Sequence, residues 1–244
     1  MIRNIFILGV GVSCEYMREF KKTHVRSTYI YYDPSKSFEW YEKQILEYEG
    51  FVNLIGFSLG GIISLKFKTK HEHKVKRLII IGFPSLFSSI YKTKLMYHLY
   101  PDTWSTPLRA EKKIYPIYLR ILSCIDYFPK IVKTPVKRFI YSLMNPDSPE
   151  TIVKCVAEYK MISFLSSIRE YFVDTNINKL LNRSKTNIHL IIGESDEFNH
   201  VSEVFFSTTQ PYIILHRCRE EGHHILYTNP VLVSNKIQSI CNTF

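Results

Sequence analysis

The residues with the clearest chemical potential lie around Ser58, in the sequence NLIGFSLGG, which contains the pattern Gly-x-Ser-x-Gly. An apolar, strand-like run at residues 51–57 precedes Ser58, and a helix-like segment at residues 59–70 follows it. A chain that passes directly from a strand into a helix strains the residue at the turn, and its close neighbours, here Gly56 and Gly60, must be small. Such a turn exposes the Ser58 hydroxyl, so the pattern predicts a serine nucleophile.

A serine hydroxyl needs a general base to become a nucleophile. Two histidines, His223 and His224, follow Glu-Gly after the strand-like run at residues 212–218. The carboxyl ends of parallel strands meet at one edge of a sheet, so this loop is expected on the same edge as Ser58. Adjacent side chains point in different directions, so only one of the two histidines can reach Ser58, and spacing alone does not decide which.

The base in turn needs a carboxylate that orients it. Asp196 follows the apolar run at residues 187–193 and is also expected at the carboxyl edge of the sheet. Glu194 and Glu197 are nearby alternatives. The candidates therefore occur in the chain order serine, acid, histidine.

Strand-like and helix-like segments alternate in both end regions of the chain, and the strand-like segments are continuous apolar runs. This pattern predicts an α/β fold with a mostly parallel sheet of about six strands that is covered on both faces. The predicted strands are residues 2–10, 27–32, 51–57, 75–82, 187–193 and 212–218, and the predicted helices are residues 15–25, 37–48, 59–70, 202–208 and 230–241.

The regular alternation of strand-like and helix-like segments is absent from the middle of the chain, where several prolines divide helical patterns. We therefore predict an α/β core formed by residues 1–84 and 186–244, and a helical cap or lid inserted as residues 85–185. The cap segment, residues 85–185, carries 16 Lys and Arg against 8 Asp and Glu, so most of the net charge of +10 lies there. A Lys-rich, solvated surface is the plainest interpretation of this excess.

The order Ser58, Asp196, His223 and the loops that carry these residues resemble the α/β-hydrolase superfamily, in particular its carboxylesterase- and thioesterase-like serine hydrolases with a helical cap. The resemblance covers nearly the whole chain outside residues 85–185. It implies the α/β-hydrolase fold, and it implies His223 as the base, because the family's base directly follows Gly in this loop. A Ser at this turn argues against the family branches whose nucleophile is a carboxylate.

An oxyanion hole of two backbone N–H groups is expected beside the serine. The turn places the Leu59 N–H at a helix N-terminus, where it points at a developing oxyanion. The resemblance implies Val10 N–H as the second donor, since Leu8-Gly9-Val10-Gly11 is similar to the family's His-Gly-x-Gly stretch, with Leu8 in place of His. The family's Gly-containing stretch after the next strand is replaced here by Asp-Pro-Ser-Lys-Ser at residues 33–37.

The activity implied is hydrolysis of a carboxylic ester or thioester through an acyl-enzyme on Ser58. An aromatic-rich cap with a basic rim fits an acyl group on an anionic carrier, such as acyl carrier protein, coenzyme A or a phospholipid. Two alternatives stay open: an acyltransferase that uses the same three residues, and a non-catalytic binding protein on a hydrolase fold. No recognition motif supports nucleic-acid binding.

Composition excludes several other classes of protein. A chain of 244 residues with 45% hydrophobic residues can bury a large core, which excludes disorder. No apolar run is long enough to span a membrane, and the apolar N-terminal run is expected to form the first buried strand. Five cysteines without Cys-x-x-Cys spacing favour a reducing cytoplasm over disulfides or a zinc site. His71 and His73 are expected to be surface residues, and no metal or cofactor is expected.

Overall fold

The computed structural model describes residues 2–24, 26–83, 149–160, 177–184, 186–196 and 212–242, together with residues 129, 134, 135, 138, 163, 167, 170 and 171. Most of the predicted cap segment, and the predicted helix at residues 202–208, lie outside the described residues. The division into a core of residues 1–84 and 186–244 and a cap of residues 85–185 therefore stays a prediction.

A parallel sheet of six strands organises the described part of the chain, in the order β2-β1-β3-β4-β5-β6. Each neighbouring pair of strands in this order runs parallel, which confirms the predicted α/β fold class. The strands are β1 (Arg3–Ile7), β2 (Thr28–Ile30), β3 (Val52–Phe57), β4 (Val75–Ile81), β5 (Ile188–Gly193) and β6 (Ile213–Cys218). All six residues of the central strand β3 are buried, as expected for a strand covered on both faces.

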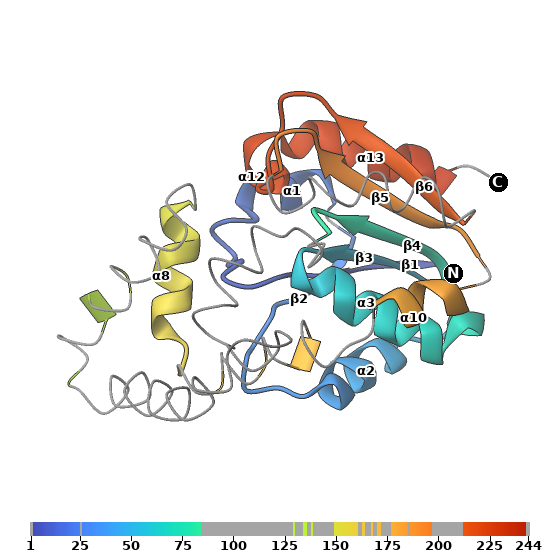
Figure 1. Ribbon diagram of the computed structural model, residues 1–244, viewed down its shortest axis with the longest axis horizontal. Helices are drawn as coiled ribbons and strands as arrows, with labels where there is room; N and C mark the ends of the chain where they lie inside the picture. Colours follow the sequence, from blue (N-terminus) through green and yellow to red (C-terminus); the bar gives the residue numbers. More distant parts are fainter. Residues whose placement is uncertain are drawn as a thin grey trace, which may run out of the picture.

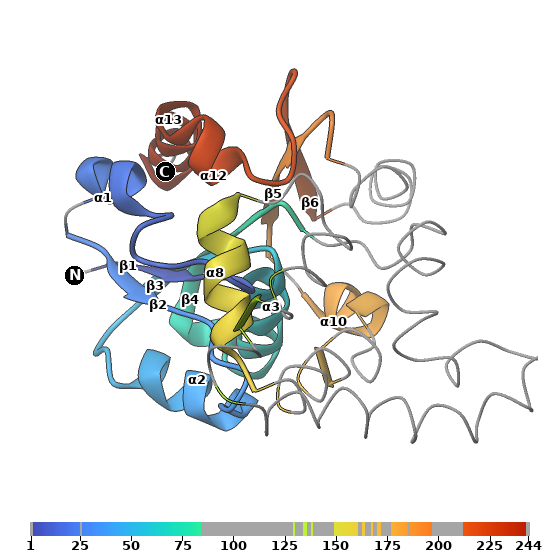
Figure 2. The same ribbon diagram turned by 90° about the vertical axis from the view of Figure 1, so that its left-hand side faces the viewer.

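Helices cover both faces of the sheet (Figure 1). On one face lie α2 (Phe38–Leu46), α3 (Leu59–Lys70) and α10 (Ile177–Arg183), and on the other lie α1 (Arg18–Thr23), α12 (Ile225–Thr228) and α13 (Pro230–Asn242). A short 3-10 helix, η1 (Glu72–Lys74), connects α3 to β4. The helix α8 (Glu150–Glu158) stands across the edge of the sheet at which the strands end (Figure 2).

Alternation along the strands divides the apolar residues between two cores. In β1, Ile5 and Ile7 face the core under α2 and α3, whereas Phe6 faces the core under α1 and α13. These three side chains are at most 1% exposed. Full burial of one such side chain contributes about 1.5–3 kcal/mol, so the two cores hold the strand ends, and the loops that follow them, in place.

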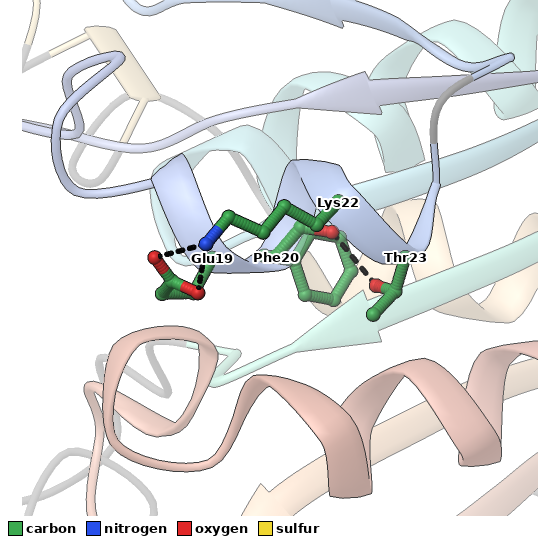
Figure 3. Close-up of polar contacts among 4 residues, drawn as sticks. All are labelled: Glu19, Phe20, Lys22 and Thr23. Carbon is green, nitrogen blue, oxygen red and sulfur yellow. Dashed lines mark hydrogen bonds and ion pairs between the residues drawn. The ribbon is translucent and has the colours of Figure 1, made fainter.

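The helix α1 shows which contacts attach a short helix to the sheet. Lys22 Nζ lies 2.7 Å from Glu19 Oε2, and the Thr23 hydroxyl donates to the Phe20 carbonyl oxygen at 2.7 Å (Figure 3). The ion pair is exposed and stabilises little. The Phe20 ring is fully buried, with its centroid 5.3 Å from that of Phe6, so this apolar contact attaches α1 to the sheet.

The helix α10 belongs to the layer of α3 although it lies within residues 85–185. It contacts α3, and its Leu181 is 2% exposed and belongs to the same core as Ile188 at the start of β5. The chain therefore returns to the sheet through α10 before it enters β5.

Candidate active site

Ser58 occupies a sharp, strained turn between β3 and α3. Its backbone has φ 52° and ψ −123°, a conformation that costs a residue with a side chain about 1–3 kcal/mol. A Cβ on Gly56 would stand 2.6 Å from the Gly60 carbonyl oxygen, and a Cβ on Gly60 would stand 2.0 Å from the Ile7 carbonyl oxygen. Both positions therefore require glycine, which is the steric reason for the Gly-x-Ser-x-Gly pattern.

The structure brings Ser58, His223 and Asp196 together in one line of hydrogen bonds. His223 Nε2 lies 3.0 Å from Ser58 Oγ, and His223 Nδ1 lies 3.0 Å from Asp196 Oδ2. The Asp196 side chain is fully buried and that of His223 is 11% exposed. A carboxylate at Nδ1 keeps the ring proton there, which leaves the Nε2 lone pair to accept the serine proton.

Backbone contacts between the loops after β5 and β6 set this geometry. The Ser195 N–H donates to the Glu221 carbonyl oxygen at 2.9 Å, and the Asp196 N–H donates to the Gly193 carbonyl oxygen at 3.1 Å. A Cβ on Gly193 would stand 2.1 Å from that same Glu221 oxygen. These contacts hold the loop after β5, which carries Asp196, against the loop after β6, which carries His223.

The structure also separates the predicted alternatives. Asp196 contacts His223, whereas the Glu194 side chain is exposed and Glu197 lies outside the described residues. His224 points elsewhere, with its Nδ1 3.4 Å from the Tyr16 hydroxyl. Burial, and the neighbouring His223, lower the pKa of His224 to about 3, so this ring is neutral near pH 7. Burial also raises the pKa of Tyr16, which keeps its hydroxyl protonated.

The two predicted oxyanion donors lie on segments that are in contact. Leu59 is the first residue of α3, and a Cβ on Gly9 would stand 3.2 Å from the Leu59 nitrogen and 2.9 Å from the Ser58 Cβ. Val10 follows Gly9 directly. Within the described ranges, neither the Leu59 N–H nor the Val10 N–H donates to a backbone carbonyl. That these two amides form an oxyanion hole stays a prediction.

A residue with no sequence signature also contacts this loop. The Gly11 N–H donates to the Tyr159 hydroxyl at 3.2 Å. Gly11 has φ 74°, and a Cβ there would stand 2.5 Å from Ile152 Cγ2 of α8. Sequence reasoning missed Tyr159 because a single tyrosine at the end of a helix, 148 residues from its partner, belongs to no motif.

Outside this site, the described residues offer little for a metal. No three His, Cys, Asp or Glu side chains of that part of the chain lie close enough together to hold a metal ion. His73 is exposed, and His71 Nε2 lies 2.5 Å from Glu42 Oε1. No helix in the described ranges is both long and apolar enough to cross a membrane.

Comparison with known proteins agrees with this fold. A sequence model of the family described as alpha/beta hydrolase fold matches residues 7–114. No curated protein matches the chain significantly in sequence.

Three solved structures illustrate the similarity. A hydrolase from Oleispira antarctica aligns with a TM-score of 0.64 at 15% identity, over 100% of this chain and 92% of its own. A carboxylesterase from the ammonia-oxidizing thaumarchaeon Nitrososphaera gargenis aligns with a TM-score of 0.61 at 14% identity, over 98% and 89%. The thioesterase domain from the curacin biosynthetic pathway aligns with a TM-score of 0.57 at 13% identity, over 97% and 90%.

The protein therefore has the α/β-hydrolase fold, as the resemblance drawn from the sequence implied. At these identities the structural neighbours define the fold and leave the substrate open.

Proposed function

We propose that the protein is a serine hydrolase that cleaves a carboxylic ester or thioester through an acyl-enzyme on Ser58. The observation that carries this proposal is the unbroken line from Ser58 Oγ through His223 to Asp196, with both hydrogen bonds at 3.0 Å. The strained backbone of Ser58 supports it, because backbone strain of this kind concentrates at functional sites.

In the proposed reaction, His223 Nε2 takes the hydroxyl proton as Ser58 Oγ bonds to the substrate carbonyl carbon. The carbonyl oxygen becomes an oxyanion, which accepts hydrogen bonds from the Leu59 and Val10 N–H groups. The protonated His223 then gives its proton to the leaving alcohol or thiol as the bond to the acyl group breaks. His223 then takes a proton from water as the water oxygen attacks the acyl carbon. It gives this proton to Ser58 Oγ as the acyl–oxygen bond breaks, which releases the carboxylic acid and restores Ser58.

Asp196 acts through His223, because its buried carboxylate holds the ring tautomer and stabilises the imidazolium that forms. Each oxyanion donor is expected to contribute about 10²–10³ in rate, since it acts on charge that develops only in the transition state. Acyl transfer to an alcohol or amine would use the same residues, and product analysis with an added nucleophile separates the two reactions.

The proposed substrate is an acyl group on an anionic carrier or small molecule. We propose that residues 85–185 include a lid over Ser58, and the excess of Lys and Arg in this segment supports an anionic leaving group. A thioesterase and a carboxylesterase among proteins of the same fold are consistent with either bond type. The four cysteines in the described part of the chain are free, which is consistent with the proposed cytoplasmic location.

The test is intact-mass analysis after treatment with a fluorophosphonate, followed by turnover of p-nitrophenyl esters and acyl thioesters. We expect one adduct on the wild type and none on Ser58→Ala, with Ser234→Ala, which removes a buried serine from α13, as the control that keeps the adduct. An adduct that persists in Ser58→Ala, or a folded wild type without adduct or turnover, would refute the proposal.

A further inference from the structure

The Tyr159 hydroxyl, just beyond the last residue of α8, joins two loops at the carboxyl edge of the sheet. It accepts a hydrogen bond from the Gly11 N–H at 3.2 Å, in the loop after β1. It donates to the Tyr32 carbonyl oxygen at 3.4 Å, in the loop after β2. The Tyr159 hydroxyl oxygen also accepts a hydrogen bond from the Cys155 thiol of α8 at 3.6 Å. The three contacts match the one donor and two acceptor sites of a phenol.

Burial keeps this phenol in the form that the contacts need. Tyr159 packs against both cores, and its ring meets that of Tyr32 edge-on, with the centroids 6.0 Å apart. Burial strongly raises the pKa of Tyr159, so the hydroxyl stays protonated and can both donate and accept. Two methyl groups of α8, Ile152 Cγ2 and Val156 Cγ2, cover Gly11 from the same side.

The loop that these groups hold is the one that carries Val10. The Val10 N–H and the Gly11 N–H belong to the two peptide planes that meet at the Val10 Cα, so the bond to Tyr159 fixes the second plane. The first plane begins at Gly9, which packs against the turn at Ser58. A loop with glycine on both sides of Val10 has wide conformational freedom unless both planes are held.

We propose that Tyr159 is a positioning residue that holds the Val10 N–H in the orientation needed to bind the oxyanion. This inference rests on the proposed serine hydrolase function. Oxyanion donors accelerate a reaction only when they are oriented before charge develops. Because Tyr159 ends α8, the same contact makes the oxyanion hole depend on how α8 is seated against the loop after β1.

The test compares Tyr159→Phe with Tyr171→Phe, using the activated p-nitrophenyl ester turned over by the wild type. Tyr171 is a matched control: it is fully buried, and its hydroxyl has no hydrogen-bond partner among the described residues. Rates are normalised to active sites titrated with the fluorophosphonate, so that any misfolded fraction does not count.

We expect kcat of Tyr159→Phe to fall about tenfold, with KM within about twofold of the wild type, because a small displacement of a donor weakens transition-state binding alone. The pH dependence of kcat stays that of the wild type. Amide hydrogen exchange of residues 9–12 becomes faster in Tyr159→Phe and stays at the wild-type rate in Tyr171→Phe.

A kcat for Tyr159→Phe within twofold of the wild type overturns the positioning role, and so does an equal fall in Tyr171→Phe. A Tyr159→Phe protein that is unfolded by circular dichroism also overturns it, because the residue would then be structural. A wild type without turnover or adduct overturns the proposed hydrolase function itself. An active wild type with an unaffected Tyr159→Phe variant overturns only the role of Tyr159.

Discussion

Replacing Gly9 with alanine tests whether the loop after β1 forms part of the active site. The added Cβ would stand 2.8 Å from the Phe57 carbonyl oxygen and 2.9 Å from the Ser58 Cβ. Both atoms belong to the turn that the sheet and α3 hold in place, so neither can retreat easily. We therefore expect the loop after β1 to move instead.

The size of the effect follows from these distances. Restoring an ordinary contact of 3.4 Å with both atoms requires a shift of about 0.6 Å, which moves Val10 away from the proposed oxyanion position. Misplacement by about 0.5–1 Å costs roughly 10- to 100-fold in rate. The overpacking itself is expected to cost about 1–3 kcal/mol of stability.

The assay measures kcat/KM for an activated ester together with the thermal unfolding midpoint. The control is Gly222→Ala, because a Cβ at Gly222 would meet nothing within 4 Å. We expect a loss of 10- to 100-fold in kcat/KM for Gly9→Ala and a change of less than about twofold for Gly222→Ala. A folded Gly9→Ala protein with wild-type kcat/KM would show that the loop after β1 does not contribute to catalysis.

His223→Ala should lower kcat by at least about 10³-fold, whereas His224→Ala should lower it less than about tenfold, because of the two only His223 contacts Ser58. Steady-state kinetics measure both effects, and the reverse ranking would make His224 the base. Gly60→Ala should destabilise the fold by about 3 kcal/mol or more, because its Cβ would stand 2.0 Å from a carbonyl oxygen of β1. Urea unfolding measures this loss, and a wild-type midpoint would contradict the packing argument. Burial lowers the pKa of His189 to about 4 and that of His224 to about 3. As the pH falls below about 6.5, these two histidines therefore bind protons in the unfolded chain while they stay neutral in the folded protein. These two histidines should therefore not lower the free energy of unfolding above pH of about 6.5, and should lower it as the pH drops toward 4. The fall should be smaller in His189→Gln. Unchanged urea midpoints between pH of about 7.5 and 5 would refute this expectation.

The sequence predicted the fold class because the signals involved are local. The strands of the sheet coincide with apolar runs, and the predicted helices that correspond to α1, α2, α3 and α13 follow such runs, so their type and order can be seen without tertiary information. The helices α10 and α12 were not predicted. The predicted helix at residues 59–70 has the observed bounds of α3. The predicted strand at residues 2–10 is longer than β1, Arg3–Ile7, because apolar Leu8 and Val10 extend the pattern into the loop that packs against the turn at Ser58.

The sequence also singled out Ser58, because a strand-to-helix turn flanked by glycines is a local steric requirement. It could not by itself separate His223 from His224, or Asp196 from Glu194, since neighbours in a loop differ only in the direction of their side chains. That direction depends on the fastening of the loops after β5 and β6 to each other, through contacts such as Ser195 N–H to the Glu221 carbonyl oxygen.

Tertiary structure alone joined Gly11 to Tyr159, across 148 residues and from two segments with no common motif. It also brought Gly9 against the turn at Ser58, because β1 and β3 are neighbours in the sheet although residues 8–51 separate them in the chain. Residue types and local spacing thus determined the chemistry that this chain can attempt. The order of the strands decided which side chains and amides stand close enough to carry it out, because hydrogen bonds and steric contacts act only over a few ångströms.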